Sequence, residues 1–146
     1  MRIIVKAFGH GAVIPRKHAC DGNDLSPELA IEDVPPGTKS LAIIMDDPDA
    51  PVGLFTHWIA YGISPDTKSI PEGAGNGESI KSGINDFGMA GYRGPCPPAG
   101  KPHRYYFTLY ALNAEKLEPG SGRQGFDAAL RGKIIEKASY MGTYSR

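Results

Sequence analysis

The sequence predicts a mainly β protein, a sandwich of two antiparallel sheets with one or two short helices near the C-terminus. About seven segments have the alternating, β-branched or aromatic composition of strands. Only residues 125–138 show helical spacing, with Phe126, Leu130 and Ile134 four residues apart. No helical segment connects successive strands, as a parallel sheet would require. We expect one domain over residues 1–146.

The expected strands follow one another with turns rich in glycine and proline between them. We place six of them at residues 2–8, 29–31, 40–46, 55–63, 103–112 and 140–144. The strand at 40–46 is apolar on both faces, which is typical of a central strand. Residues 9–27, 64–89 and 113–122 are expected to be loops. A loop as long as 64–89 is usually functional or disordered.

A first motif, DPDAP, directly follows the strand at 40–46. Residues 41, 43 and 45 are apolar and share one face, and the same parity brings Asp47 onto that face. The chain must reverse tightly here, so we predict a cis peptide between Ala50 and Pro51. An Asp-Pro-Asp run alone is also ordinary turn and capping chemistry, and this alternative stays open.

A second motif is the stretch GYRGPCPPAGKPHRYYFTLYAL, residues 91–112. Its glycines and prolines exclude a helix and indicate a stiff surface loop. At the join between loop and strand, His103 and Tyr105 share a face, which is an arrangement typical of a pocket wall. Without further context, each would be interpreted as an ordinary strand residue.

A histidine-tryptophan pair, His57 and Trp58, lies in the expected strand at 55–63. Strict alternation would place His57 on the same face as Ile59, Tyr61 and Ile63. A single strand histidine beside a tryptophan is more often a satisfied core residue than part of a site.

Charge and composition exclude several classes of protein. Sixteen basic and sixteen acidic residues cancel, which argues against a nucleic-acid partner. No apolar run approaches the roughly 20 residues of a transmembrane span, and the N-terminus lacks a signal-peptide core. We therefore predict a soluble, cytoplasmic protein. Cys20 and Cys96 lack metal-site spacing and are too few for a disulfide framework, so we interpret them as free thiols.

Taken together, DPDAP, HW and GPCPPAGKPHRY resemble motifs of the phosphatidylethanolamine-binding protein family, in particular its bacterial and archaeal Raf kinase inhibitor-like branch. The likeness runs nearly end to end and includes FGHGAVIPRKHACDGNDLSPEL, NDFGMAGYRGPCPP and MGTYSR. Each motif alone is weak, but their order and separation are specific. The resemblance implies a fold of two β-sheets and a small pocket for phosphate and similar anions.

Carried over by motif position, the resemblance implies a ligand-binding site made of six residues. They are Asp47, His57, Gly94, Pro97, His103 and Tyr105. Eukaryotic members place a tyrosine shortly before the pocket histidine, whereas this chain has VGLF at residues 52–55, so the replacement for that tyrosine is an open question.

The residue types of this site suit an anion. The two histidines and the tyrosine hydroxyl are donors, and N–H groups of the loop can form an anion nest. Asp47 repels anions, so we expect it either to hold one imidazole or to accept the ammonium of an ethanolamine-like head group.

The leading hypothesis is a non-enzymatic protein that binds a phosphate-type anion or a phosphorylated head group, with no cofactor or metal. The alternative, also implied by the resemblance, is an inhibitor or regulator of a serine protease or kinase that acts through the pocket mouth. An enzyme that uses Asp47 and the histidines in acid–base or zinc chemistry is disfavoured, because no nucleophile elbow or HExxH arrangement is present. A homodimer is compatible with all of these hypotheses.

Overall fold

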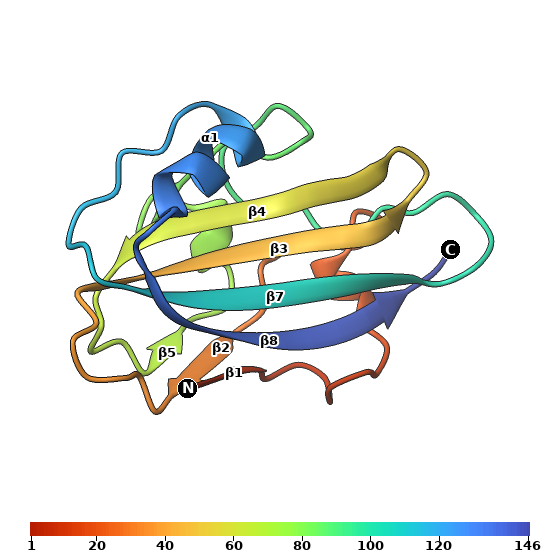
Figure 1. Cartoon of the computed structure of the whole chain (residues 1–146). Coiled ribbons are helices and arrows are strands. Elements are labelled where there is room, and N and C mark those ends of the chain that lie inside the picture. The colour runs from red at the N-terminus through yellow and green to blue at the C-terminus, as the bar shows by residue number, and fades with distance from the viewer.

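Two antiparallel β-sheets face each other in the computed structural model, which describes residues 1–146 (Figure 1). The larger sheet has the order β6 (Lys81–Ser82), β4 (Gly53–Ile63), β3 (Ser40–Ala50), β7 (His103–Leu112) and β8 (Ile134–Tyr144). The smaller has the order β1 (Arg2–Val5), β2 (Leu29–Glu32) and β5 (Ser69–Ile70). One α-helix, α1 (Gly122–Leu130), and two short 3₁₀ turns, η1 (Arg16–His18) and η2 (Ala74–Asn76), complete the fold. The prediction of a two-sheet β fold with a helix near the C-terminus is confirmed.

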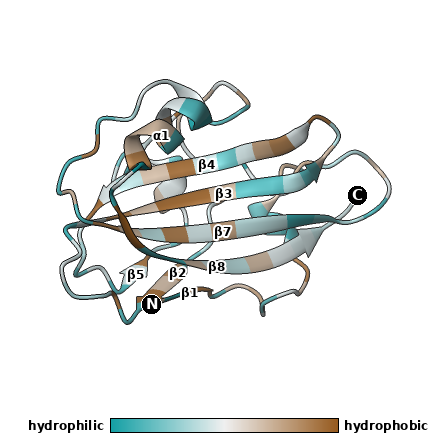
Figure 2. Ribbon diagram, viewed as in Figure 1, coloured by the Kyte–Doolittle hydropathy of each residue, from teal (hydrophilic) through white to brown (hydrophobic).

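The main core lies between the two sheets. Leu41, Ile43 and Met45 of β3 are fully buried there, as the alternation predicted, against apolar residues of β1, β2 and β7. Along β3 the sequence changes from hydrophobic to hydrophilic, and its polar end carries the DPDAP motif (Figure 2). The buried face of β3 therefore continues into the polar DPDAP motif at the end of the same strand.

The outer face of the large sheet is covered by α1 (Figure 1). Phe126 and Leu130 pack there on the alternate residues of β3, including Ile44. Arg123 of α1 donates to Asp46 Oδ2 at 2.8 Å, so an ion pair also fixes the helix on β3. No helix of this fold is long and apolar enough to span a membrane.

The predicted helix over 125–138 is only partly right. Residues Phe126 and Leu130 are buried on one helix face, but the helix ends at Leu130, and Gly132 takes a φ of 76° in the following turn. Ile134 then starts β8, which pairs with β7 along its length. The four-residue apolar spacing of Ile134 is compatible with either a helix or a strand, and pairing with the long strand β7 favours the strand.

Two further expectations about local structure are wrong. No peptide bond is cis, Ala50–Pro51 included. The hairpin between β3 and β4 instead reverses with Gly53 at a φ of 99°, which only glycine adopts readily, so a cis bond is not needed. The first strand ends at Val5 rather than at residue 8.

The two cysteines form a disulfide and are not free thiols, so that interpretation was wrong as well. Cys20 follows η1 and Cys96 lies in the loop before β7, 76 residues later. The fold brings these loops together until the Cα atoms are 5.3 Å apart. A single pair at this separation has no spacing signal that the sequence could have revealed.

Candidate functional site

A cavity of about 220 Å³ lies at the polar end of β3, and we call it the histidine pocket. It is lined by Asp47, Ala50, Pro51, Val52, Phe55, His57, Phe87, Cys96, Pro97, Pro98, His103 and Tyr105. A larger surface hollow of about 640 Å³ lies between residues 31–38 and 65–68, but none of its polar side chains is buried. The histidine pocket is the stronger candidate because buried, titratable side chains converge in it.

Five of the six expected site residues line this pocket, and Gly94 does not. The Gly94 N–H donates to Asp24 Oδ1 at 2.7 Å, and a Cβ atom at Gly94 would lie 1.9 Å from the carbonyl oxygen of His18. Glycine is required at this position because two loops pack closely, so its role is to position the chain beneath the pocket rather than to form its rim.

Sequence reasoning missed several apolar wall residues. The ring of Phe87 packs on that of His57 in a T-shaped pair with centroids 5.4 Å apart, and the Phe55 centroid lies 5.1 Å from that of His57 and 4.8 Å from that of Phe87. Phe87 belongs to residues 64–89, which were expected to be a loop but also contain β5, η2 and β6. The length of that segment was the only signal of a functional role. Cys96 was not among the expected site residues, yet it is part of the wall.

Asp47 holds His103 in place. The Nδ1 atom of His103 lies 2.7 Å from Asp47 Oδ2, and the N–H of Asp49 donates to Asp47 Oδ1 at the same distance. Asp47 is 3% exposed, and both of its oxygens are engaged by the chain itself. This geometry favours the first of the two expected roles, that of orienting an imidazole, over accepting a ligand ammonium.

A β-bulge turns His57 into the pocket. Trp58 and Thr56 pair with successive residues of β3, so His57 between them is the additional residue. Its ring therefore reaches the inner side, with its centroid 5.3 Å from that of Tyr105, while Ile59 packs on the α1 side. The expectation that His57 and Ile59 share a face was wrong, because strict alternation does not allow for a bulge.

Both histidines have one ring nitrogen committed and one free. His57 Nδ1 donates to the carbonyl oxygen of Arg93 at 2.8 Å, as His103 Nδ1 does to Asp47. Neither Nε2 has a protein partner, and neither is among the buried unpaired atoms. Because both residues line the pocket, their Nε2 atoms are accessible to a molecule inside it.

Electrostatics set the protonation of these groups. Burial lowers the pKa of His57, and the hydrogen bond to Arg93 only partly offsets that effect. Burial raises the pKa of Tyr105 well above its usual value, and the nearby charge of Asp47 adds to the shift, so its hydroxyl stays protonated. The pocket thus contains one fixed donor group and two imidazoles that can gain a proton. No group of three or more His, Cys, Asp or Glu residues is placed to hold a metal ion.

Comparisons with known proteins agree with this architecture. A family model described as "Phosphatidylethanolamine-binding protein" matches residues 5–145. A UPF0098 protein from Aquifex aeolicus is 46% identical over 156 residues, covering 100% of this chain and 89% of that protein. A second, from Pyrococcus horikoshii, is 46% identical and covers 98% of this chain and 76% of that protein.

Solved structures share the fold. A phosphatidylethanolamine-binding protein homologue from Chlamydia trachomatis, CT736, superimposes with a TM-score of 0.90 at 40% identity, covering 99% of this chain and 97% of that one. YbcL from E. coli, described as a member of the mammalian phosphatidylethanolamine-binding protein family, superimposes with a TM-score of 0.92 at 32% identity. The match covers 99% of this chain and 98% of YbcL. From the family match, the identities and the shared fold, the chain belongs to the phosphatidylethanolamine-binding protein family.

Proposed function

We propose that this chain is a non-enzymatic binding protein whose histidine pocket takes a phosphate-type anion or a phosphorylated head group such as phosphoethanolamine. The observation that carries the proposal is the pair of free Nε2 atoms, from His57 and His103, in one small cavity. Family membership supports a ligand-binding role in general.

The donor chemistry is specific. Because each Nδ1–H is already used, a neutral imidazole offers only a lone pair to the pocket. A protonated imidazole offers an Nε2–H and a positive charge. An anion therefore binds with proton uptake, or else brings its own hydroxyl hydrogen to an Nε2 lone pair. Phosphate can do either.

The size and stiffness of the pocket suit a small ligand. About 220 Å³ is below the range of drug-sized sites, and Pro51, Pro97 and Pro98 stiffen its wall. A stiff wall keeps the donors in place before the ligand arrives, which reduces the entropy lost on binding.

Isothermal titration with phosphate at pH 6 tests the proposal, with phosphoethanolamine as competitor. We expect His57→Ala and His103→Ala each to weaken binding by about tenfold or more, which is the value of a charge-assisted hydrogen bond. His10→Ala is the matched control, since His10 is exposed and lies outside the pocket. If both pocket variants bind phosphate as well as the wild type does, the pocket is not the anion site.

One observation favours a second candidate, a protein-binding regulator of a serine protease or kinase. Large apolar side chains are exposed at or near the pocket mouth, with Val52 83%, Leu54 52%, Phe87 42% and Met89 46% exposed. Val52 and Phe87 also line the pocket itself. Under this alternative, Leu54→Asp, a change at an exposed residue outside the pocket lining, abolishes capture of a protease or kinase while phosphate affinity is kept. Equal capture by the variant and the wild type would argue against this surface.

A further inference from the structure

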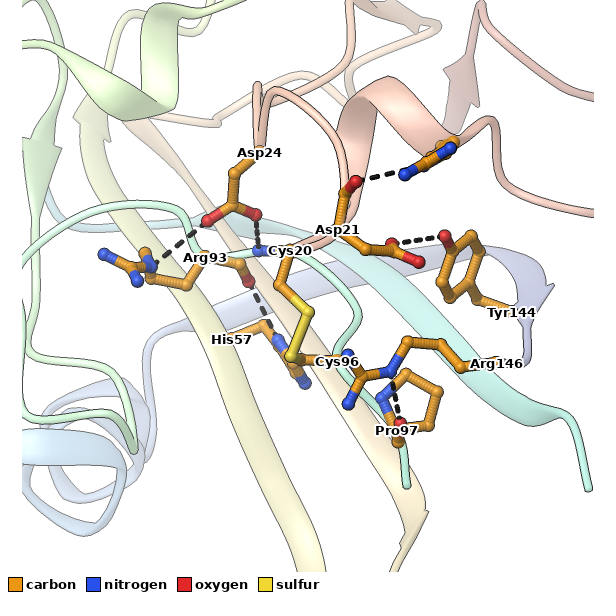
Figure 3. Close-up of a disulfide and its surroundings, with 11 residues drawn as sticks. Cys20, Asp21, Asp24, His57, Arg93, Cys96, Pro97, Tyr144 and Arg146 are labelled. Carbon is orange, nitrogen blue, oxygen red and sulfur yellow. Dashed lines mark hydrogen bonds and ion pairs between the residues drawn. A yellow bond between two sulfur atoms is a disulfide. The ribbon is translucent and has the colours of Figure 1, made fainter. Parts of the chain in front are cut away.

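The disulfide forms part of the wall of the histidine pocket. Cys96 lines the cavity, and Cys20 holds it from the loop that also carries Asp21 and Asp24 (Figure 3). Both cysteines are partly exposed to solvent. A thiol reagent can therefore reach this bond, unlike a disulfide enclosed in a core.

The chain before Cys96 is held without the disulfide. Four contacts join residues 92–95 to the loop at 18–24: Tyr92 hydroxyl to His18 carbonyl at 2.7 Å, Gly94 N–H to Asp24 at 2.7 Å, Cys20 N–H to Pro95 carbonyl at 3.0 Å, and Arg93 to Asp24 at 3.2 Å. This stretch includes the Arg93 carbonyl that accepts from His57. The anchor of His57 is thus independent of the sulfur–sulfur bond.

The chain after it, residues 96–102, depends on the disulfide far more. We call these residues the wall segment. Besides the disulfide, the wall segment is held by two hydrogen bonds to Arg146. The Nε of Arg146 donates to the Pro97 carbonyl at 2.7 Å (Figure 3). The Arg146 carbonyl accepts from the Gly100 N–H at 3.1 Å. The segment supplies Cys96, Pro97 and Pro98 to the pocket. The covalent bond therefore fixes one wall of the pocket and leaves the two histidines to other contacts.

We propose that Cys20–Cys96 is a reversible redox site, with a dithiol as its reactant, that sets the shape of the histidine pocket. The consequence for anion affinity rests on the proposed function above. One thiolate of the dithiol attacks a sulfur of the pair and forms a mixed disulfide, and the other sulfur leaves as a thiolate and takes a proton. The second thiol of the reductant then displaces the remaining cysteine. Two electrons and two protons pass to the protein, which gains two thiols, and the dithiol becomes a disulfide.

Reduction frees the wall segment and leaves the fold in place. His103 stays bonded to Asp47 and His57 to Arg93, because neither contact involves the sulfurs. The prolines then lose their fixed position, so the pocket is less preorganised. We expect the Kd for phosphate to rise about three- to tenfold on reduction, and to return on reoxidation.

The test compares oxidised protein, protein reduced with dithiothreitol, and the Cys20→Ser/Cys96→Ser variant, by phosphate titration and hydrogen–deuterium exchange. We expect weaker phosphate binding and faster exchange over residues 96–102 in both altered forms, with residues 91–95 and the strands unchanged. The double variant is the control for the reductant, since dithiothreitol must have no effect on it.

The outcomes separate the two proposals. If oxidised protein binds phosphate and reduction changes neither affinity nor exchange, the redox site is wrong and the binding function stands. If no form binds phosphate, the binding function fails, and exchange alone decides: faster exchange confined to 96–102 supports the redox site, and unchanged exchange refutes it. Loss of circular dichroism and of exchange protection throughout the reduced protein also refutes it, because the bond would then be a staple of the whole fold.

Discussion

Anion binding in the histidine pocket is expected to depend on pH through the protein itself, and sulfate is the ligand that shows this. Sulfate carries no titrating proton between pH 6 and 8, whereas phosphate does. Burial lowers the pKa of His57, so its neutral form dominates at neutral pH and presents a lone pair to the ligand. Sulfate has no hydrogen to give to that lone pair, so a hydrogen bond from His57 Nε2 to sulfate requires the imidazole to take up a proton from solvent.

The magnitude follows from the number of protons. Where the imidazole is neutral in the free protein and gains one proton on binding, each rise of one pH unit weakens the apparent affinity tenfold, or by about 1.4 kcal/mol. We therefore expect the Kd for sulfate to rise about tenfold from pH 7 to pH 8 through the protonation of His57 on binding. Phosphate should show a shallower dependence, because its monoanion can donate its own hydroxyl hydrogen to a neutral Nε2.

Titration calorimetry at one pH, in buffers of different ionisation enthalpy, measures the protons directly. His57→Gln is the matched variant, since its amide donates without protonation and the variant should take up one proton fewer. A sulfate affinity that stays constant from pH 6 to pH 8, with no proton uptake in any buffer, would falsify the reasoning from the ring nitrogens.

Two predictions concern stability. Gly142→Ala should reduce the free energy of unfolding by about 1–3 kcal/mol in urea melts, because its Cβ would lie 2.4 Å from the Phe8 ring. Gly9→Ala is the control, having no atom within 4 Å of its Cβ, and equal losses in the two variants would contradict the packing argument. The second uses pH: burial lowers the pKa of both His18 and His57, so the unfolded chain binds more protons below about pH 6.5. Stability should be full at pH 7.5 and smaller at pH 5.5 in anion-free buffer, and identical melts at both would count against it.

The parts of the fold that could be predicted from sequence are those decided by local pattern. The strand from His103 to Leu112 has the bounds that were expected, because buried residues alternate with less buried ones from His103 to Ala111. The same alternation correctly placed Asp47 on the face of β3 that carries Met45. Motif resemblance then pointed to five residues that line one cavity, although their binding role stays a prediction.

Three of the failures share a different physical origin, because each depends on contacts between distant parts of the chain. The sequence around His57 contains no glycine that would signal a bulge, and the offset is visible only in the register with β3. Ile134 has helical spacing, but β7 was available to pair with it. Cys20 and Cys96 meet because two loops pack through Gly94, and no local pattern records such an approach.

Neighbouring carboxylates on β3 give the sheet a further property. Asp46 points to the outer face and pairs with Arg123, while Asp47, one peptide away, points inward to His103. The contact that fixes α1 on the sheet and the contact that orients His103 are therefore made by adjacent residues joined by one peptide unit. Mutations under α1 that tilt this unit are therefore expected to move His103 while every residue that lines the histidine pocket is conserved.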